Sequence, residues 1–372
     1  MDFTFPAFLL PDLLREILVF AIKALTVLCL VQVVVMVLHK LLLERKERRV
    51  ALLKSRYLSA MYQVLANRPV DLGAPRDHVE LSALADVCIY LMASASREQR
   101  ELIGKTVRDC GIVRFYSEQL ARARFWIARY KLVERLGFLE LPELAPLFRG
   151  IVSSQQEDRQ VVGKAAWALS LVCSEEDLPQ ILARVSQPDF MSAKFNEHLF
   201  VNIVASFLAR GEKERLLELF AELLAGDTLP LLVKRDFIEA CGNAGLAEAQ
   251  PLLMFCADKY GASPEMRIAC LRSLQKLGGD MLDAVVLAGL RDEDWRVRAV
   301  AAKSVENCSE AVIPPLELAL ADLSYYVRLN AALSLGRKGA SGRAALKRQA
   351  ESQDRFVREV SRYVMREREL PC

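Results

Sequence analysis

One segment of nine residues occurs three times in the C-terminal part of this chain, as DWRVRAVAA at 294–302, SYYVRLNAA at 324–332 and DRFVREVSR at 354–362. Each copy starts 30 residues after the previous one and carries a Val-Arg pair at the same two positions. Weaker copies precede these three, at 161–169, 234–238 and 266–271. A fixed period of this length indicates helix pairs that stack on one another, each burying its apolar face against the next.

Beyond residue 79 the sequence shows almost no alternation of apolar and polar residues, which predicts an all-α fold without a sheet. The repeated segments resemble HEAT repeats, particularly the phycobilisome-lyase type, whose consensus is D-x-x-x-x-V-R-x-x-A-A. The resemblance is strong over 281–365 and moderate at 155–180 and 262–278. It implies that residues 79–372 form an α-solenoid of HEAT-like helix pairs.

In that family an Asp in the turn of each repeat bonds an Arg six residues further on, and these pairs form a structural ladder along the solenoid. The pairs with this spacing are Asp292 with Arg298 and Asp322 with Arg328. Ser352 stands six residues before Arg358, so the resemblance implies that the ladder ends in the last unit. We expect these charges to be structural rather than functional, because a buried charge without its partner is costly.

A long apolar run covers residues 17–38, and only Lys23, Thr26 and Gln32 interrupt it with polar side chains. Its 22 residues rise roughly 33 Å as an α-helix, enough to cross a hydrocarbon core of about 30 Å. Seven Lys or Arg against two Glu follow the run in 39–56, whereas acidic residues outnumber basic ones before it. Positive flanks stay in the cytoplasm, which predicts a single-pass bacterial inner-membrane protein with its N-terminus outside and its C-terminal domain in the cytoplasm.

The predicted organisation has five parts: an extracytoplasmic interfacial segment 1–16, a transmembrane helix 17–38, a basic juxtamembrane amphipathic helix 39–66, a linker 67–78 and the cytoplasmic solenoid 79–372. Two features leave alternatives open. Lys23 lies about 9 Å inside the run, and it either snorkels to the outer headgroups or pairs with a carboxylate of a membrane partner. The basic stretch 40–56 either contacts anionic headgroups or is the ordinary topology signal.

Composition and motifs argue against several classes of function. The net charge is only +3, with acidic and basic residues mixed beyond residue 56, so we expect no nucleic-acid partner. The nine cysteines include no C-x-x-C pair and fit reduced thiols in a cytoplasmic domain. Metal-dependent HEAT enzymes such as deoxyhypusine hydroxylase need several His-Glu pairs, whereas this chain offers only Glu197-His198, in reversed order. We therefore predict no enzyme activity, no metal, no cofactor and no small-molecule substrate.

What remains is a surface for a protein partner. Large aromatic side chains beside Arg at the start of stacked helices are typical of binding anchors. The candidates are Trp295, Arg296, Tyr325, Tyr326 and Arg355. For Trp295 and for Phe356, packing between repeats is the competing interpretation.

The order of elements also resembles a group of membrane-anchored HEAT proteins that are associated with processive glycosyltransferases. That resemblance implies a scaffold that docks a protein partner, an integral membrane complex, as an accessory subunit of a polysaccharide synthase in exopolysaccharide biosynthesis. The competing hypothesis is a regulatory or signalling adaptor that recruits a soluble cytoplasmic partner. A lyase-like HEAT enzyme is the third.

Overall fold

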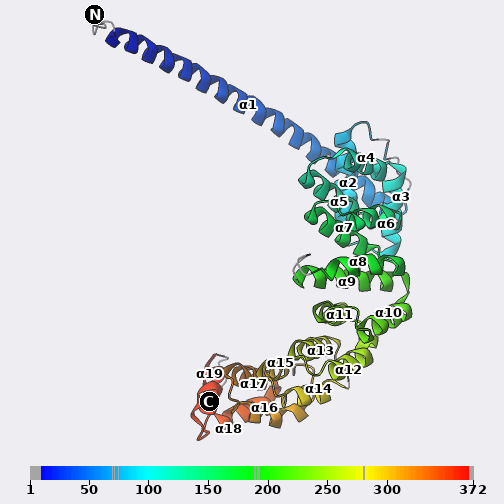
Figure 1. Ribbon diagram of the computed structural model, residues 1–372, viewed down its shortest axis with the longest axis vertical. Coiled ribbons are helices and arrows are strands. Elements are labelled where there is room, and N and C mark those ends of the chain that lie inside the picture. Colours follow the sequence, from blue (N-terminus) through cyan, green and yellow to red (C-terminus); the bar gives the residue numbers. More distant parts are fainter. Residues whose placement is uncertain are drawn as a thin grey trace, which may run out of the picture. The chain divides into compact units, whose positions relative to one another are not determined.

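The computed structural model describes residues 10–68, 70, 72–73, 75–187, 190, 193–279 and 281–367 (Figure 1). These residues form α-helices and short 3-10 helices, and no strand occurs among them, which confirms the predicted all-α class. The predicted interfacial segment 1–16 lies outside the described residues up to position 9. The chain divides into two compact units, Met1–Tyr116 and Ser117–Cys372.

The first unit contains one very long helix and three ordinary ones: α1 Leu10–Leu65, α2 His78–Met92, α3 Arg97–Asp109 and the start of α4 Ile112–Arg122. Over Glu16–Leu65, α1 is long and apolar enough to cross a membrane by length and composition, and no other helix of the described ranges is. The apolar side chains of its 17–38 stretch are all exposed within the protein. The structure thus supports the predicted membrane anchor through one observation, a long apolar helix near the N-terminus.

The C-terminal end of α1 is part of a packed core, unlike its apolar stretch. Tyr57 and Met61 are buried where α1 packs on α2. Arg49 forms an ion pair of 2.5 Å with Asp77, whose side chain also accepts hydrogen bonds from the first amides of α2. Asp77 is therefore the N-cap that starts α2 at His78, and it ties the two helices together.

The second unit is a row of stacked helices in two layers. In one layer α5 packs on α7, and the same relation continues through α9, α11, α13, α15, α17 and α19 (Figure 1). In the other layer α6, α10, α12, α14, α16 and α18 each pack on the helix that follows them. This arrangement is consistent with a helical-repeat protein. The bounds are α5 Trp126–Gly137, α6 Ala145–Ser153, α7 Arg159–Leu171, α8 Leu178–Val185, α9 Ala193–Arg210, α10 Lys213–Ala225, α11 Leu231–Asn243, α12 Gln250–Lys259, α13 Pro264–Leu277, α14 Leu282–Gly289, α15 Trp295–Lys303, α16 Ile313–Ala319, α17 Tyr325–Arg337, α18 Gly339–Gln349 and α19 Arg355–Glu367.

The 30-residue period of the sequence reappears as a period of helix starts. Helices α15, α17 and α19 begin at Trp295, Tyr325 and Arg355, and short 3-10 helices precede α6, α8, α12 and α16. The valines of the repeated Val-Arg pairs, at 297, 327 and 357, are all buried, and those at 327 and 357 belong to one continuous apolar cluster. The alanines of the following turn are buried with them, and their small side chains let adjacent helices approach closely.

Helices α11 and α13 approach each other closely at Gly242. A Cβ atom placed there would lie 2.6 Å from the Cα of Ser273 and 2.8 Å from its Cβ, which is closer than real contacts allow. Ser273 cannot move aside freely, because it is buried and its hydroxyl donates to the carbonyl oxygen of Ile238. Gly150 in α6 is the matched contrast, since a Cβ there would meet nothing within 4 Å.

We expect Gly242→Ala to lower the free energy of unfolding by about 1–3 kcal/mol, because the added methyl group forces α11 and α13 apart. Gly150→Ala should instead leave stability unchanged or raise it by up to about 1 kcal/mol, because alanine favours the helix and the site is open. Chemical denaturation of both variants measures the difference. Equal effects of the two substitutions would contradict the close approach.

Candidate functional site

The turn before each repeated helix is built by short polar side chains. Asp294 caps α15, because its carboxylate accepts from the amide of Arg296 at 2.8 Å. Two residues earlier, Asp292 accepts from the amide of Asp294 at the same distance. The next turn repeats this contact between Asp322 and the amide of Ser324, also at 2.8 Å. These turns fix where each helix starts and hence which side chains stand at its exposed end.

The arginine of each Val-Arg pair folds back onto the turn that precedes it. Arg298 donates to the carbonyl oxygens of residues 292 and 293, at 2.8 and 2.9 Å. Arg328 donates in the same way to residues 322 and 323, and Arg358 to residues 352 and 353. The expected contact over six residues therefore exists, but it is made through the main-chain carbonyl rather than through the carboxylate.

The carboxylates pair with the arginine of the preceding repeat instead. Asp292 lies 2.8 Å from Arg267, and Asp322 lies 2.7 Å from Arg298. All four side chains are largely buried. The ladder thus links one repeat to the next, and Arg267 comes from the weaker copy of the repeat at 266–271.

The ladder changes character at its C-terminal end. Ser352 occupies the place of the acid, so no carboxylate stands there for Arg328. Its guanidinium group lies over the ring of Phe356, 4.9 Å from the centroid, and 5.9 Å from that of Tyr325. A cation over an aromatic face replaces the ion pair at this step.

Exposed aromatic side chains line the start of the same helices. Trp295 stacks on Tyr326 with ring centroids 5.5 Å apart, and Tyr326 meets Tyr325 edge-on at 5.8 Å. The exposed fractions are 44% for Trp295, 56% for Tyr325 and 60% for Tyr326. Phe356 is equally exposed and reaches this group through Arg328. We call Trp295, Tyr325, Tyr326 and Phe356 the aromatic row.

The two exposed arginines near the row are engaged with acidic neighbours. Arg296 pairs with Asp294 at 2.8 Å and with Glu265 at 2.9 Å. Hydrogen bonds from its side chain and its amide hold the pKa of Asp294 down to about 2. Arg355 pairs with Glu359 at 2.8 Å. Both are exposed pairs that a partner can replace at little cost. Lys23, the membrane candidate, lies exposed on α1, which belongs to the first unit.

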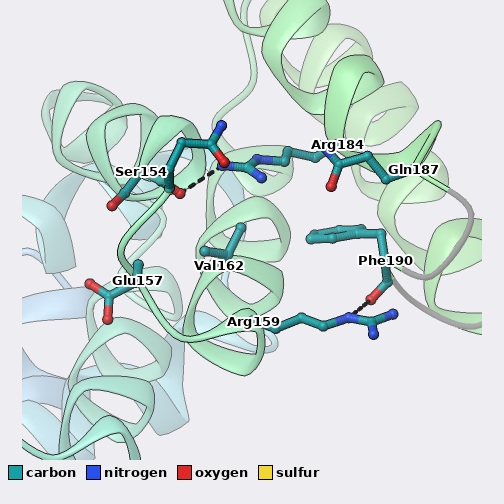
Figure 2. A pocket seen from close by; sticks show the side chains of 8 residues that line it. Ser154, Glu157, Arg159, Val162, Arg184, Gln187 and Phe190 are labelled. Carbon is teal, nitrogen blue, oxygen red and sulfur yellow. Dashed lines mark hydrogen bonds between the residues drawn. The ribbon is translucent and has the colours of Figure 1, made fainter.

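A pocket of about 360 Å³ lies between α7, α8 and the loops around them, and the sequence analysis did not anticipate it (Figure 2). Arg184 donates across it to the carbonyl oxygens of Val152 and Ser154, both at 2.7 Å. Arg159 donates to the carbonyl oxygen of Phe190 at 2.7 Å, as Figure 2 shows. Both guanidinium groups therefore hold loops in place. Neither arginine belongs to a Val-Arg pair, so the repeat pattern gave no signal for this pocket.

Burial keeps several cysteine thiols of the described ranges in their protonated form. Burial raises the pKa of Cys88 and of Cys241 to about 12, and that of Cys256 to about 11, so these thiols stay protonated at neutral pH. No three His, Cys, Asp or Glu side chains gather as a metal site within the described residues.

Comparison with known protein families found no match, and comparison with curated proteins found none either. Among solved structures, that of human deoxyhypusine hydroxylase in complex with glycerol is similar at 17% identity and a TM-score of 0.25. The match covers 86% of this chain and 99% of that one. The prediction that the chain is not an enzyme is contradicted by this finding, because the matched protein is an enzyme, and we withdraw that prediction. A TM-score this low carries no argument about a reaction.

We expect Asp322→Ala to lower the free energy of unfolding by about 1–3 kcal/mol, because it leaves the largely buried Arg298 without its carboxylate. The matched control is Glu293→Ala, an exposed acid 3.7 Å from Arg267, which should change stability by less than about 0.5 kcal/mol. Chemical denaturation measures both. An Asp322→Ala protein as stable as the control would contradict the ladder.

The stabilisation that Asp322 contributes should also depend on pH. Burial alone would raise the pKa of Asp322, but hydrogen bonds from Arg298 and from the amide of Ser324 outweigh it and lower that pKa below 3.8. The folded protein then holds the proton less tightly than the unfolded chain, so the stabilisation is complete above pH 3.8 and is lost as the pH falls through the folded pKa. The melting temperatures of wild type and Asp322→Ala should therefore converge only in acid.

Proposed function

We propose that this chain is a membrane-anchored HEAT-like α-solenoid that docks a protein partner at the cytoplasmic face of a bacterial inner membrane. The observation that carries the proposal is the aromatic row, a set of large rings that stack on one another while staying open to solvent. The solenoid interpretation draws on the 30-residue period, the two layers of helices and the ladder between repeats.

The anchor is the apolar stretch 17–38 of α1. Its side chains are exposed in the described protein, and a bilayer would cover them. The basic residues that follow in the sequence support an orientation with the N-terminus outside. A single reporter experiment tests this orientation.

A reporter that is active only in the periplasm should be silent when it is fused after Cys372, whereas a cytoplasmic reporter at the same place should be active. The physical reason is the excess of positive charge on the C-terminal side of the apolar stretch. Fusion before residue 10 gives the reciprocal control. Periplasmic activity at the C-terminus would contradict the proposed orientation.

The aromatic row has the properties of a prepared binding surface. Stacking fixes the rings of Trp295 and Tyr326 before any partner arrives, so little side-chain freedom remains to be lost on binding. Tyrosine and tryptophan combine a large apolar area with a polar group that stays solvated in the free protein. Their burial by a partner would therefore contribute more than that of the surrounding charged residues.

For the partner we propose an integral membrane complex, a polysaccharide synthase of which this chain is an accessory subunit. This choice rests on the resemblance in the order of elements, and a soluble signalling protein is the alternative. Affinity purification from solubilised membranes with mass spectrometry separates the two. Recovery of an integral glycosyltransferase supports the synthase, and recovery of soluble proteins alone supports the adaptor.

We expect the double substitution Tyr325→Ala and Tyr326→Ala to lower partner recovery roughly tenfold or more, because both rings belong to the proposed surface. Charge reversal at Arg296 is a less specific variant, because Arg296 also holds Asp294 and Glu265. Tyr90→Ala is the matched control, since that tyrosine is as exposed but lies in α2. Helicity of each variant is checked by circular dichroism. Recovery at the wild-type level with the double variant would place the docking surface elsewhere.

A further inference from the structure

Three consecutive large apolar side chains are exposed at the turn between α4 and α5. Phe125, Trp126 and Ile127 form this FWI turn, and Phe125 is 79% exposed. Phe125 stands at the N-cap position of α5, where its side chain makes no capping hydrogen bond. A run of three such side chains on a surface marks a site that something covers.

The FWI turn is held from beneath, so its exposure is built into the fold. Arg129 donates to the carbonyl oxygen of Leu120 at 2.9 Å and to that of Ala123 at 3.4 Å, which closes the turn. Glu157 holds the same guanidinium at 2.5 Å, and both charged side chains are largely buried. The buried ion pair thus fixes the backbone that presents the three apolar side chains to solvent.

The charges around the FWI turn are mostly positive. Arg122, Arg124 and Lys131 are all exposed, and the one acidic residue of 117–131 is Glu118, 3.7 Å from Arg122. Arg129 lies in the same stretch, but Glu157 neutralises it. Aromatic and aliphatic side chains flanked by Arg and Lys are the composition that favours the interface of an anionic bilayer, where rings enter the headgroup layer and cations meet phosphates.

Chain length brings the FWI turn within reach of a bilayer. Arg49 is 11 residues beyond the end of the apolar stretch, about 16 Å along α1, and it pairs with Asp77. The next residue, His78, stacks on Phe115 with ring centroids 5.2 Å apart. Only nine residues of chain then separate Phe115 from Phe125. We propose that the FWI turn is a second, peripheral membrane contact, which inserts into an anionic lipid surface. This rests on the proposed function only in that α1 brings the chain to the membrane.

Quenching by brominated lipid tests the proposal on the full chain. The protein is reconstituted in bilayers of equal parts phosphatidylcholine and phosphatidylglycerol, with brominated or with ordinary acyl chains. The tryptophan emission of the wild type should be quenched by the brominated chains, and Trp126→Phe should lose most of that quenching. Trp295→Phe, the matched control, removes another exposed tryptophan and should keep it. Equal quenching of wild type and Trp126→Phe would overturn the proposal, and a protein would then be the cover of this turn.

The charges are tested by Arg122→Glu combined with Arg124→Glu, which should weaken quenching of Trp126 in the mixed bilayer and not in phosphatidylcholine alone. Unchanged quenching in the mixed bilayer would overturn the anionic part of the proposal. Phe20→Trp in the Trp126→Phe background reports on the anchor itself, because Phe20 lies in the apolar stretch. Strong quenching of Phe20→Trp without quenching of Trp126 would contradict the second membrane contact alone. An unquenched Phe20→Trp would contradict the membrane anchor.

Discussion

The stacking of the C-terminal helices depends on the bond between the arginine of one repeat and the aspartate of the next. Arg298 donates to the carbonyl oxygens of its own turn and to the carboxylate of Asp322 in the following turn. One side chain thereby fixes where its own helix starts and where the next turn lies. The valine beside it, Val297, is buried, so the apolar and polar faces of the repeat specify the same register. Such agreement between levels is what selects one fold.

The ladder also decides what the surface can display. Because the ladder fixes the turns at which α15 and α17 start, it also places the first two residues of these helices, which are exposed. The first two positions of α15, α17 and α19 include Trp295, Tyr325, Tyr326 and Phe356, and of these Tyr325 and Phe356 also lie near the guanidinium group of Arg328. The repeat thus separates two roles within six residues of sequence. The charges inside the turn hold the fold, and the rings outside it are available for binding.

Much of this was predictable from the sequence, and the failures have physical causes. The period of 30 residues predicts the helix starts at Trp295 and Tyr325, because backbone periodicity survives any change of surface residues. The ladder partners were misjudged, since the spacing within one repeat says nothing of the 25 residues that separate Arg267 from Asp292. The FWI turn gave no signal, because three adjacent apolar residues look like any buried helix start. The exclusion of enzymes failed for another reason, since a missing motif in one chain does not fix its function.

A small surface is sufficient for docking when the protein is held at a membrane. The aromatic row consists of four side chains, and a contact of that size between two freely diffusing proteins would be weak. Confinement of both partners to one bilayer raises the apparent affinity, because a tether increases the effective concentration of one partner near the other. A peripheral contact such as the FWI turn would narrow the orientations that the C-terminal unit samples and lower the entropic cost of docking further. Under the proposed function, the anchor and the FWI turn hold the protein at the membrane. This confinement compensates for the weak binding expected of a surface as small as the aromatic row.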